Sequence, residues 1–301
     1  MKVYDCFPFY NEFELLELRL KSLWDIVDYF VLVEADKTQS NIPKPFFFAE
    51  RINDFKEFLP KIRHVPLRIE IDYKGVGDWQ IENAQRNGIM YGLTDSYPED
   101  LIFISDVDEI PAPDILKRIN ENRAPLITNC AVSPPFHGRA LMIPCQLQVS
   151  TAEFLNYFPV ALNQVFHYYY FDWATKKDWR GTAIVKRKNL TTPQEVRQLR
   201  KNMPIIQNGG RHFSYMGGVD RIINKMKAIV EGNEFLSKNE QLTNRDHIME
   251  CMRTGKDIYG RQNIPESQFY PYDIEKINLP YLDEFLKKYP YFLREYDFKD
   301  D

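Results

Sequence analysis

The stretch that decides the fold reads Asp100-Leu101-Ile102-Phe103-Ile104-Ser105-Asp106-Val107-Asp108-Glu109-Ile110-Pro111. It opens as a short apolar run with β-branched and aromatic members, which predicts a buried strand. Three acids follow within four residues, at or just past the carboxyl end of that strand. Because ligands bind at this edge of an open α/β sheet, the same stretch predicts a ligand site.

Asp106 and Asp108 are two residues apart, so in an extended chain their side chains project to the same side. Two like charges about 4 Å apart repel by roughly 4 kcal/mol at an effective dielectric near 20, so we expect a positive group between them. Oxygen ligands suit Mg²⁺ or Mn²⁺, which usually bridge carboxylates to substrate phosphates. The alternative is a turn or helix cap, but Pro113 predicts that the next helix begins there, downstream of both acids.

Further strands and helices surround this stretch. Strand patterns and apolar helix spacing alternate through the first third of the chain, which predicts a parallel, Rossmann-like nucleotide-binding half. The later segments are more irregular and end in helices and loops. We predict strands at 3–7, 29–34, 62–66 and 100–105, helices at 13–27, 49–58, 79–93 and 219–231, strand-like segments at 124–149 and 165–186, and a helical, loop-rich end from 239.

Composition excludes several classes of protein. The 301 residues carry a formal charge of -4 with dispersed basic residues, which gives no case for nucleic acid. The four cysteines form no Cys-x-x-Cys pair, as expected of reduced thiols. The amino terminus has no signal-peptide layout, and no apolar run approaches the roughly 18 residues that cross a bilayer. We therefore expect a soluble, cytoplasmic protein without an integral membrane segment.

Glycine-rich phosphate loops are missing from the sequence. Neither Gly-x-Gly-x-x-Gly nor Gly-x-x-x-x-Gly-Lys-Ser/Thr occurs, which argues against dinucleotide-dependent and P-loop enzymes. A metal would then have to hold the phosphates of a nucleotide.

Several stretches together resemble one known family, glycosyltransferase family 17. They occur in order from residue 5 to residue 257, and the set is far more specific than the acidic stretch alone. One departure is Arg211, where the family tends to have Trp. The matching pieces are Asp5-Cys6-Phe7-Pro8-Phe9-Tyr10-Asn11-Glu12, Gln85-Arg86-Asn87, Ile104 to Pro111, Gly210-Arg211-His212-Phe213-Ser214-Tyr215 and Arg253-Thr254-Gly255-Lys256-Asp257.

This resemblance implies a GT-A fold, a mixed and mostly parallel sheet flanked by helices, with a helical cap at the carboxyl end. We expect a catalytic domain at 1–240, with a nucleotide-binding half at 1–110 and an acceptor half at 111–240, and a helical extension of the same domain at 241–301. The implied activity is inverting transfer of N-acetylglucosamine or another hexose from a UDP-sugar donor to a glycan acceptor, with Mn²⁺ or Mg²⁺ as cofactor.

The resemblance also implies roles for particular residues. Asp108 would bind the metal directly, Asp106 would be shared between the metal and the donor ribose, and His212 would complete the coordination. Arg86 and Asn87 would reach the donor, since the planar fork of an arginine suits phosphate or sugar oxygens. A core histidine remains the alternative for His212, and a surface salt bridge the alternative for Arg86.

The remaining candidates lie at strand ends or in later segments. Asn11, Glu12 and Glu34 occupy places where a base and ribose would lie, although Asn11 fits a helix cap equally well. Inversion requires a general base for the acceptor hydroxyl, and the sequence does not single one out. In order of preference, the candidates are Glu234, Asp178 and Asp220.

Three other functions compete with this interpretation. A sugar-nucleotide pyrophosphorylase would need a glycine-rich basic loop after the first strand, where this chain has Pro8 to Glu12. A phosphatase with an Asp-x-Asp nucleophile would carry that motif at the end of its first strand. A non-catalytic carbohydrate-binding protein on the same fold would bind a nucleotide sugar without turnover. The sequence names neither the donor sugar, the acceptor nor the oligomeric state.

Overall fold

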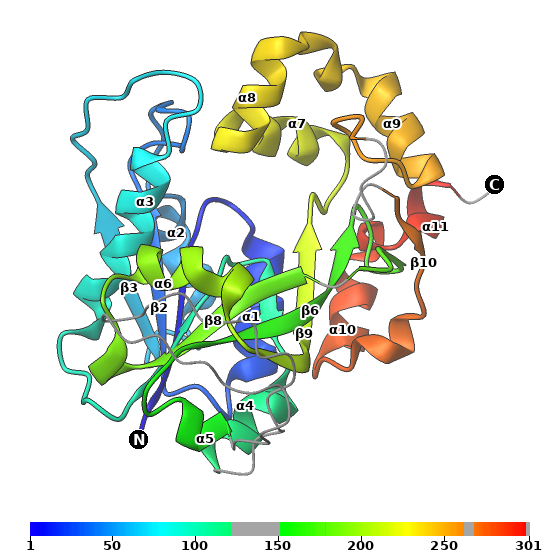
Figure 1. Ribbon diagram of the computed structural model, residues 1–301. Coiled ribbons are helices and arrows are strands. Elements are labelled where there is room, and N and C mark those ends of the chain that lie inside the picture. Colours follow the sequence, from blue (N-terminus) through cyan, green and yellow to red (C-terminus); the bar gives the residue numbers. More distant parts are fainter. Residues whose placement is uncertain (122–150, 178, 262–267, 299–301) are drawn as a thin grey trace.

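The computed structural model describes residues 1–121, 151–177, 179–261 and 268–298 (Figure 1). The strand-like segment predicted at 124–149 and the candidate base Asp178 lie outside the described residues.

The first half of the chain builds the parallel part of the sheet. Strands β1 (Val3–Pro8), β2 (Tyr29–Ala35), β3 (Ile62–Leu67) and β4 (Leu101–Ile104) lie in the order β4-β1-β2-β3, and every neighbouring pair is parallel. Helix α1 (Phe13–Leu23) forms the first crossover and buries its apolar stripe in the core shared with these strands. The predicted strand-helix-strand beginning is confirmed, because its apolar spacing matches one helix face.

The second half makes the sheet mixed. Strand β8 (Trp179–Lys186) pairs antiparallel with β4, and β6 (Val160–Tyr168) pairs antiparallel with β8. Strand β9 (Ile205–Ser214) runs parallel to β6 and holds β5 (Glu109–Pro111) on its other side. The short strands β7 (Trp173–Ala174) and β10 (Tyr270–Pro271) complete that edge. The predicted α/β fold with a mixed sheet is confirmed.

Helices flank this sheet and gather at the carboxyl end of the chain (Figure 1). Many of them are short, which fits the frequent prolines. Their bounds are α2 Phe47–Glu50, α3 Gln80–Asn87, α4 Pro113–Asn120, α5 Thr151–Phe154, α6 Pro193–Leu199, α7 Val219–Ala228, α8 Val230–Lys238, α9 Arg245–Thr254, α10 Leu282–Lys288 and α11 Arg294–Asp297.

Three predicted helices differ from the structure. In place of the helix predicted at 49–58 there are the short α2 and a 3-10 helix at Ile52–Phe55. The helix predicted at 219–231 is interrupted at Ile229, whose extended backbone (φ -93°, ψ 153°) separates α7 from α8. The helix predicted at 79–93 tightens after α3 into the 3-10 helix Gly88–Leu93. A Cβ on Gly92 would lie 2.3 Å from a methyl carbon of Val31, so this segment lies against β2 more closely than any larger residue would allow.

The carboxyl-terminal helices pack back onto the beginning of the chain. Phe285 and Phe292 share an apolar cluster with Leu15 and Leu18, the buried residues of α1 that face away from the main core. The predicted helical end of the chain is therefore confirmed. In the parts of the chain that the structure describes, no helix is long and apolar enough to cross a membrane.

Candidate active site

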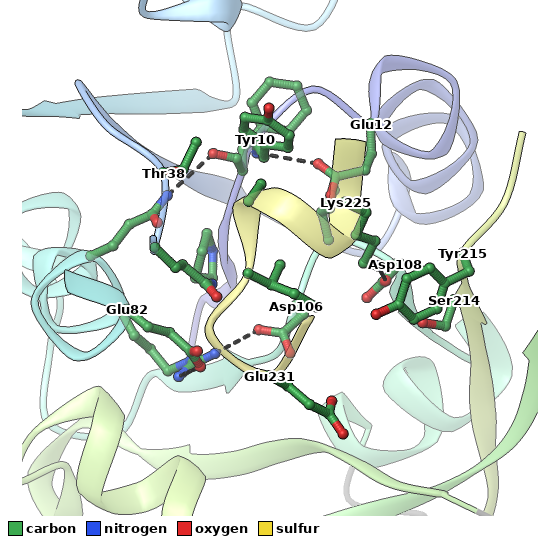
Figure 2. Close-up of a pocket in the computed structure, with 18 of the residues that line it drawn as sticks. Tyr10, Glu12, Thr38, Glu82, Asp106, Asp108, Ser214, Tyr215, Lys225 and Glu231 are labelled. Carbon is green, nitrogen blue, oxygen red and sulfur yellow. Dashed lines mark hydrogen bonds and ion pairs between the residues drawn. The ribbon is translucent and has the colours of Figure 1, made fainter. Parts of the chain in front are cut away.

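A cavity of about 270 Å³ lies beyond the carboxyl ends of β1 and β4. Figure 2 shows its lining: Tyr10 and Glu12 come from the loop after β1, and Asp106 and Asp108 from the turn after β4. Lys225 of α7 lines it too. Both halves of the chain thus contribute to one cavity, at the sheet edge where α/β proteins bind ligands.

The buried side chain of Arg19 in α1 holds the acidic turn in place from the protein interior. Its guanidinium is fully buried and binds the Asp5 carboxylate through two hydrogen bonds of 2.5 and 2.7 Å. It also donates to the hydroxyl of Ser105 and to the carbonyl oxygens of Asp106, Val107 and Glu109, at 2.6 to 3.1 Å. A single side chain therefore satisfies most of the turn's inward-facing acceptors, which explains how an irregular segment can be buried.

Asp106 is paired with two arginines. Its Oδ1 accepts a hydrogen bond from Arg86 Nη2 at 2.8 Å, and its Oδ2 accepts one from Arg197 Nη2 at 2.9 Å. Burial alone would raise the pKa of this carboxyl group, but the positive charges of Arg197 and Arg86 outweigh burial and hold the pKa well below its usual range. Asp106 therefore stays ionised and fixed in position.

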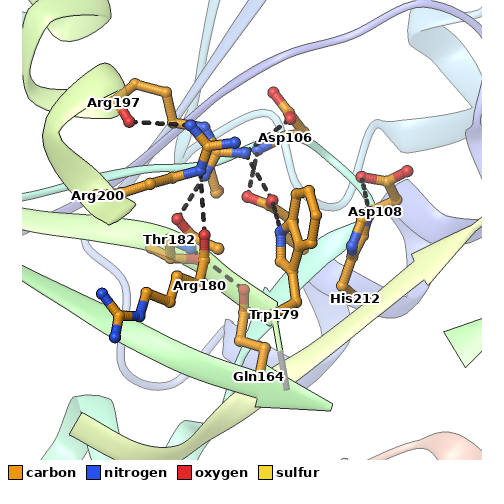
Figure 3. Close-up of polar contacts among 12 residues, drawn as sticks. Asp106, Asp108, Gln164, Trp179, Arg180, Thr182, Arg197, Arg200 and His212 are labelled. Carbon is orange, nitrogen blue, oxygen red and sulfur yellow. Dashed lines mark hydrogen bonds and ion pairs between the residues drawn. The ribbon is translucent and has the colours of Figure 1, made fainter. Parts of the chain in front are cut away.

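Asp108 faces a different pair of partners. Its Oδ2 accepts a hydrogen bond from Lys225 Nζ at 2.7 Å, and its Oδ1 lies 3.6 Å from His212 Nε2 (Figure 3). Burial would raise the pKa of Asp108, but Lys225 and His212 lower it further than burial raises it. The two aspartates were expected to share one cation; in the structure the turn backbone is not extended, and each carboxylate has its own basic neighbours.

Glu109 and His212 are partners on the neighbouring strands β5 and β9, next to this turn. Glu109 Oε1 accepts hydrogen bonds from Arg197 Nη2 and from Trp179 Nε1, both at 2.6 Å. The His212 ring stacks on Phe166, with centroids 4.7 Å apart, and lies 4.9 Å from Trp179. Glu109 thus orders the turn, and the aromatic neighbours fix the direction in which His212 faces Asp108.

The geometry of Asp108 and His212 fits part of a divalent metal site. Ligand atoms about 2.0–2.2 Å from one ion can lie up to roughly 4 Å apart, so the observed 3.6 Å is compatible with shared coordination. Asp106 does not form a three-ligand group with Asp108 and His212. Among the described residues, no three His, Cys, Asp or Glu side chains form a group that could hold a metal. The pair would need further oxygens from a phosphate or water, as Mg²⁺ sites commonly do.

Three further cations line the cavity, namely Arg200, Lys37 and Lys44. None of them forms an ion pair with any described carboxylate. Burial and repulsion from Arg197 lower the pKa of Arg200 to about 10, and burial lowers that of Lys44. Uncompensated positive charge in a cavity favours an anionic ligand.

Three residues expected at the donor lie elsewhere. Glu34 is fully buried, accepts the backbone N–H groups of Phe48 and Ala49 at the start of α2, and lies 2.6 Å from His64 Nε2. Asn87 accepts the backbone N–H of Gln194 at 3.0 Å, which joins α3 to α6. Asn11 does not cap α1, and none of the three is among the residues that line the cavity. The structure thus gives Glu34 and Asn87 tertiary contacts that a strand or helix pattern cannot reveal.

The described candidates for the general base also lie outside the cavity lining. Asp220 is exposed at the start of α7 and pairs with Arg245. Glu234 lies on α8, with an oxygen 2.8 Å from where a Cβ on Gly77 would be. The sequence interpretation missed three other cavity residues, Lys225, Arg200 and Glu231, and also Arg197, which lies behind the lining and pairs with Asp106. Only Lys225 and Glu231 carried a signal, since both lie within 20 residues after His212.

A mixed sheet flanked by helices, with an acidic turn at the carboxyl edge of its parallel strands, is an α/β architecture consistent with a GT-A-like fold. Residues 1–126 match the family model described as Glycosyltransferase family 17. The resemblance to this family, predicted from the sequence, is thereby confirmed over that part of the chain.

Named relatives agree with the family match. The chain is 34% identical over 113 residues to the beta-1,4-mannosyl-glycoprotein 4-beta-N-acetylglucosaminyltransferase of Homo sapiens. The aligned segment covers 35% of this chain and 21% of the human protein. The chain is also 34% identical over 113 residues to the Rattus norvegicus protein of the same name, covering 35% of this chain and 20% of the relative. The match spans about one fifth of the length of each relative.

Proposed function

We propose that this protein is a glycosyltransferase that moves a sugar, N-acetylglucosamine or another hexose, from a UDP-sugar donor to a glycan hydroxyl with inversion at the anomeric carbon. The observation that carries the proposal is the cavity itself. It combines an acidic turn at the carboxyl edge of the sheet with Arg200 and Lys44, two cations that pair with none of the carboxylates in the described parts of the chain. A nucleoside diphosphate brings the negative charge that these groups lack.

Some residues at the cavity would hold the donor, and others would lower the activation barrier of the transfer. Arg86 and Arg197 fix Asp106, whose outer edge can accept hydrogen bonds from a ribose. Asp108 and His212 would hold Mn²⁺ or Mg²⁺ together with the diphosphate, and the ion would supply Lewis-acid stabilisation of the leaving group. Arg200 and Lys225 also line the cavity, and their positive charge would stabilise the developing diphosphate.

The outer part of the cavity suits a sugar ring. Trp79 lines it and is 44% exposed, and Tyr10 lies beside Lys44 on the same rim. Exposed aromatic faces with polar neighbours commonly stack on the apolar faces of sugars. A glycan acceptor therefore fits this rim better than an acidic or strongly basic partner.

Thermal unfolding with UDP, in the presence and absence of Mn²⁺, tests the proposal. UDP at a concentration 100 times its dissociation constant stabilises the folded state by about 2.7 kcal/mol. We expect this to raise the midpoint temperature of unfolding by several degrees. UDP release from UDP-N-acetylglucosamine, with water or a mannose-containing glycan as acceptor, measures turnover. Asp108→Asn should reduce both signals, whereas the exposed Asp54→Asn should leave both unchanged.

The outcomes separate the competing functions. Binding of UDP without release from any UDP-sugar would favour the non-catalytic carbohydrate-binding protein. Pyrophosphate-dependent formation of UTP would favour the pyrophosphorylase. No stabilisation by any nucleotide at millimolar concentration, with or without Mn²⁺, would overturn the proposal.

A further inference from the structure

Five carboxylates line the cavity among the described residues, namely Glu12, Glu82, Asp106, Asp108 and Glu231. Asp106 and Asp108 are held in their ionised forms by cations, which makes them weak bases. Glu82 is paired with Arg86 at 2.8 Å. Glu12 folds back on its own loop and accepts the backbone N–H groups of Tyr10 and Asn11 at 3.2 and 3.0 Å. Each of these four carboxylates therefore has a structural or ion-pair contact, although Glu12 Oε1 and Glu82 Oε2 accept no hydrogen bond from the described residues.

Glu231 has a more exposed side chain than Glu82, Asp106 and Asp108, whose side chains are 14%, 39% and 6% exposed. It lies in the first turn of α8, directly after the break at Ile229 that turns the chain away from α7. Its Oε1 accepts a hydrogen bond from Arg261 Nη1 at 3.0 Å, and its Oε2 has no partner in the described parts of the chain. The side chain is 46% exposed and is drawn among the cavity residues in Figure 2. One oxygen is therefore fixed while the other stays available to a ligand.

Arg261 is itself held rigidly. Its Nη2 donates to Asp257 Oδ1 at 2.7 Å and its Nε donates to Oδ2 at 3.0 Å, a two-pronged contact with a carboxylate that is almost fully buried. The guanidinium also lies 5.1 Å from the ring centroid of Tyr259. Such a fork fixes the direction of Arg261. Asp257 thus orients Arg261, and Arg261 orients Glu231.

We propose that Glu231 is the general base of the transfer, and that Arg261 and Asp257 are the residues that position it. This inference rests on the proposed function. Glu231 takes the proton of the acceptor hydroxyl while the hydroxyl oxygen forms a bond to the anomeric carbon. The bond from that carbon to the diphosphate oxygen breaks, and its electron pair leaves with the nucleoside diphosphate. The products are a glycoside, the nucleoside diphosphate and a protonated Glu231, which then loses its proton to water.

The charges around Glu231 suit this role. Burial raises its pKa above the ordinary value, and the carboxylates of Asp257, Glu234 and Glu82 raise it further. Arg261 opposes them, because its positive charge lowers the pKa. A base whose pKa lies closer to the working pH transfers protons more effectively. Since Glu231 acts in its ionised form, the rate falls as the pH drops through this pKa.

The experiment measures UDP release from UDP-N-acetylglucosamine across the pH range, alongside thermal stabilisation by UDP. Glu231→Gln should lower the rate by about 10²- to 10⁴-fold and leave stabilisation by UDP unchanged. Arg261→Met should move the acid limb of the pH profile to higher pH, because the charge that lowers the Glu231 pKa is gone. The exposed Glu240→Gln serves as the matched control and should keep the wild-type rate.

The possible failures are distinguishable. If wild-type protein neither binds UDP nor releases it, the proposed function fails. If wild-type protein turns over and Glu231→Gln does so within threefold of it, the assignment of Glu231 is wrong. The same holds if Glu12→Gln or Glu234→Gln removes the acid limb while Glu231→Gln retains it. An acid limb that stays in place in Arg261→Met would overturn the positioning role of Arg261.

Discussion

Replacing Arg19 with Met should cost this protein a large part of its stability. Arg19 and Asp5 are both fully buried, and removing one partner of a buried ion pair costs about 3–5 kcal/mol, because the other charge is left unpaired. The same change strips hydrogen bonds from Ser105 and from three carbonyl oxygens of the acidic turn. Domains are typically stable by only about 5–15 kcal/mol, so we expect partial unfolding at physiological temperature.

Urea unfolding followed by circular dichroism measures this cost. The matched control is Arg245→Met, which removes an exposed ion pair with Asp220 and should cost less than about 1 kcal/mol. The double variant Asp5→Asn, Arg19→Met removes the stranded charge and should be no less stable than Arg19→Met alone, despite its second change. If Arg19→Met unfolds within about 1 kcal/mol of wild type, the view of Arg19 as the anchor of the turn is refuted.

Three further predictions concern the surroundings of the site. Burial lowers the pKa of His167 to about 3, so stability should fall by up to about 1.4 kcal/mol per unit as the pH drops below 6.5, and urea unfolding at pH 7 and 4.5 should show a smaller loss in His167→Phe. A Cβ on Gly210 (φ +143°) would lie 2.2 Å from a carbonyl oxygen of β5, so Gly210→Ala should lower stability by about 1–3 kcal/mol in thermal unfolding, whereas Gly218→Ala (φ +89°, with open space) should cost only its backbone strain, about 1 kcal/mol. Trp179→Phe keeps an aromatic ring beside His212 but removes the hydrogen bond to Glu109, and should cost about 1–3 kcal/mol in urea unfolding; an unchanged midpoint would contradict that contact.

Local patterns were sufficient to predict the first half of the fold. The apolar residues of α1 recur at the spacing of one helix face, and β1, β2 and β4 are short, mostly apolar runs. The parallel arrangement of these strands follows from the alternation of strands and helices along the chain. The break at Ile229 was not predicted, although Gly232 follows it closely: a Cβ on Gly232 would lie 2.2 Å from the carbonyl oxygen of Met226 in α7. The pairing of β6 with three other strands was also hidden, because its register is set by contacts with distant segments.

The candidate site was predictable where its residues are close in sequence. The acidic turn and Arg86 were found because a strand end and a helix place them at one edge of the sheet. Arg197 and Arg200 were missed, since nothing in their local sequence distinguishes them from ordinary surface charges, and Glu231 was missed although it lies within 20 residues after His212. Burial near other charged groups makes them functional candidates. Glu34 shows the opposite error, because an acid at a strand end can serve a helix amino terminus instead.

The acids of the turn and their counter-charges are separated along the chain. Residues 1–126 contain Asp106, Asp108 and Arg86, while Arg197, His212 and Lys225 come later. During synthesis, the contact between Asp108 and Lys225 can form only after the chain has been extended to residue 225. Arg86 can pair with Asp106 within residues 1–126, but Asp108 has neither Lys225 nor His212 there, so a fragment made only of the matched segment would be a poor substitute for the whole chain in a biochemical assay.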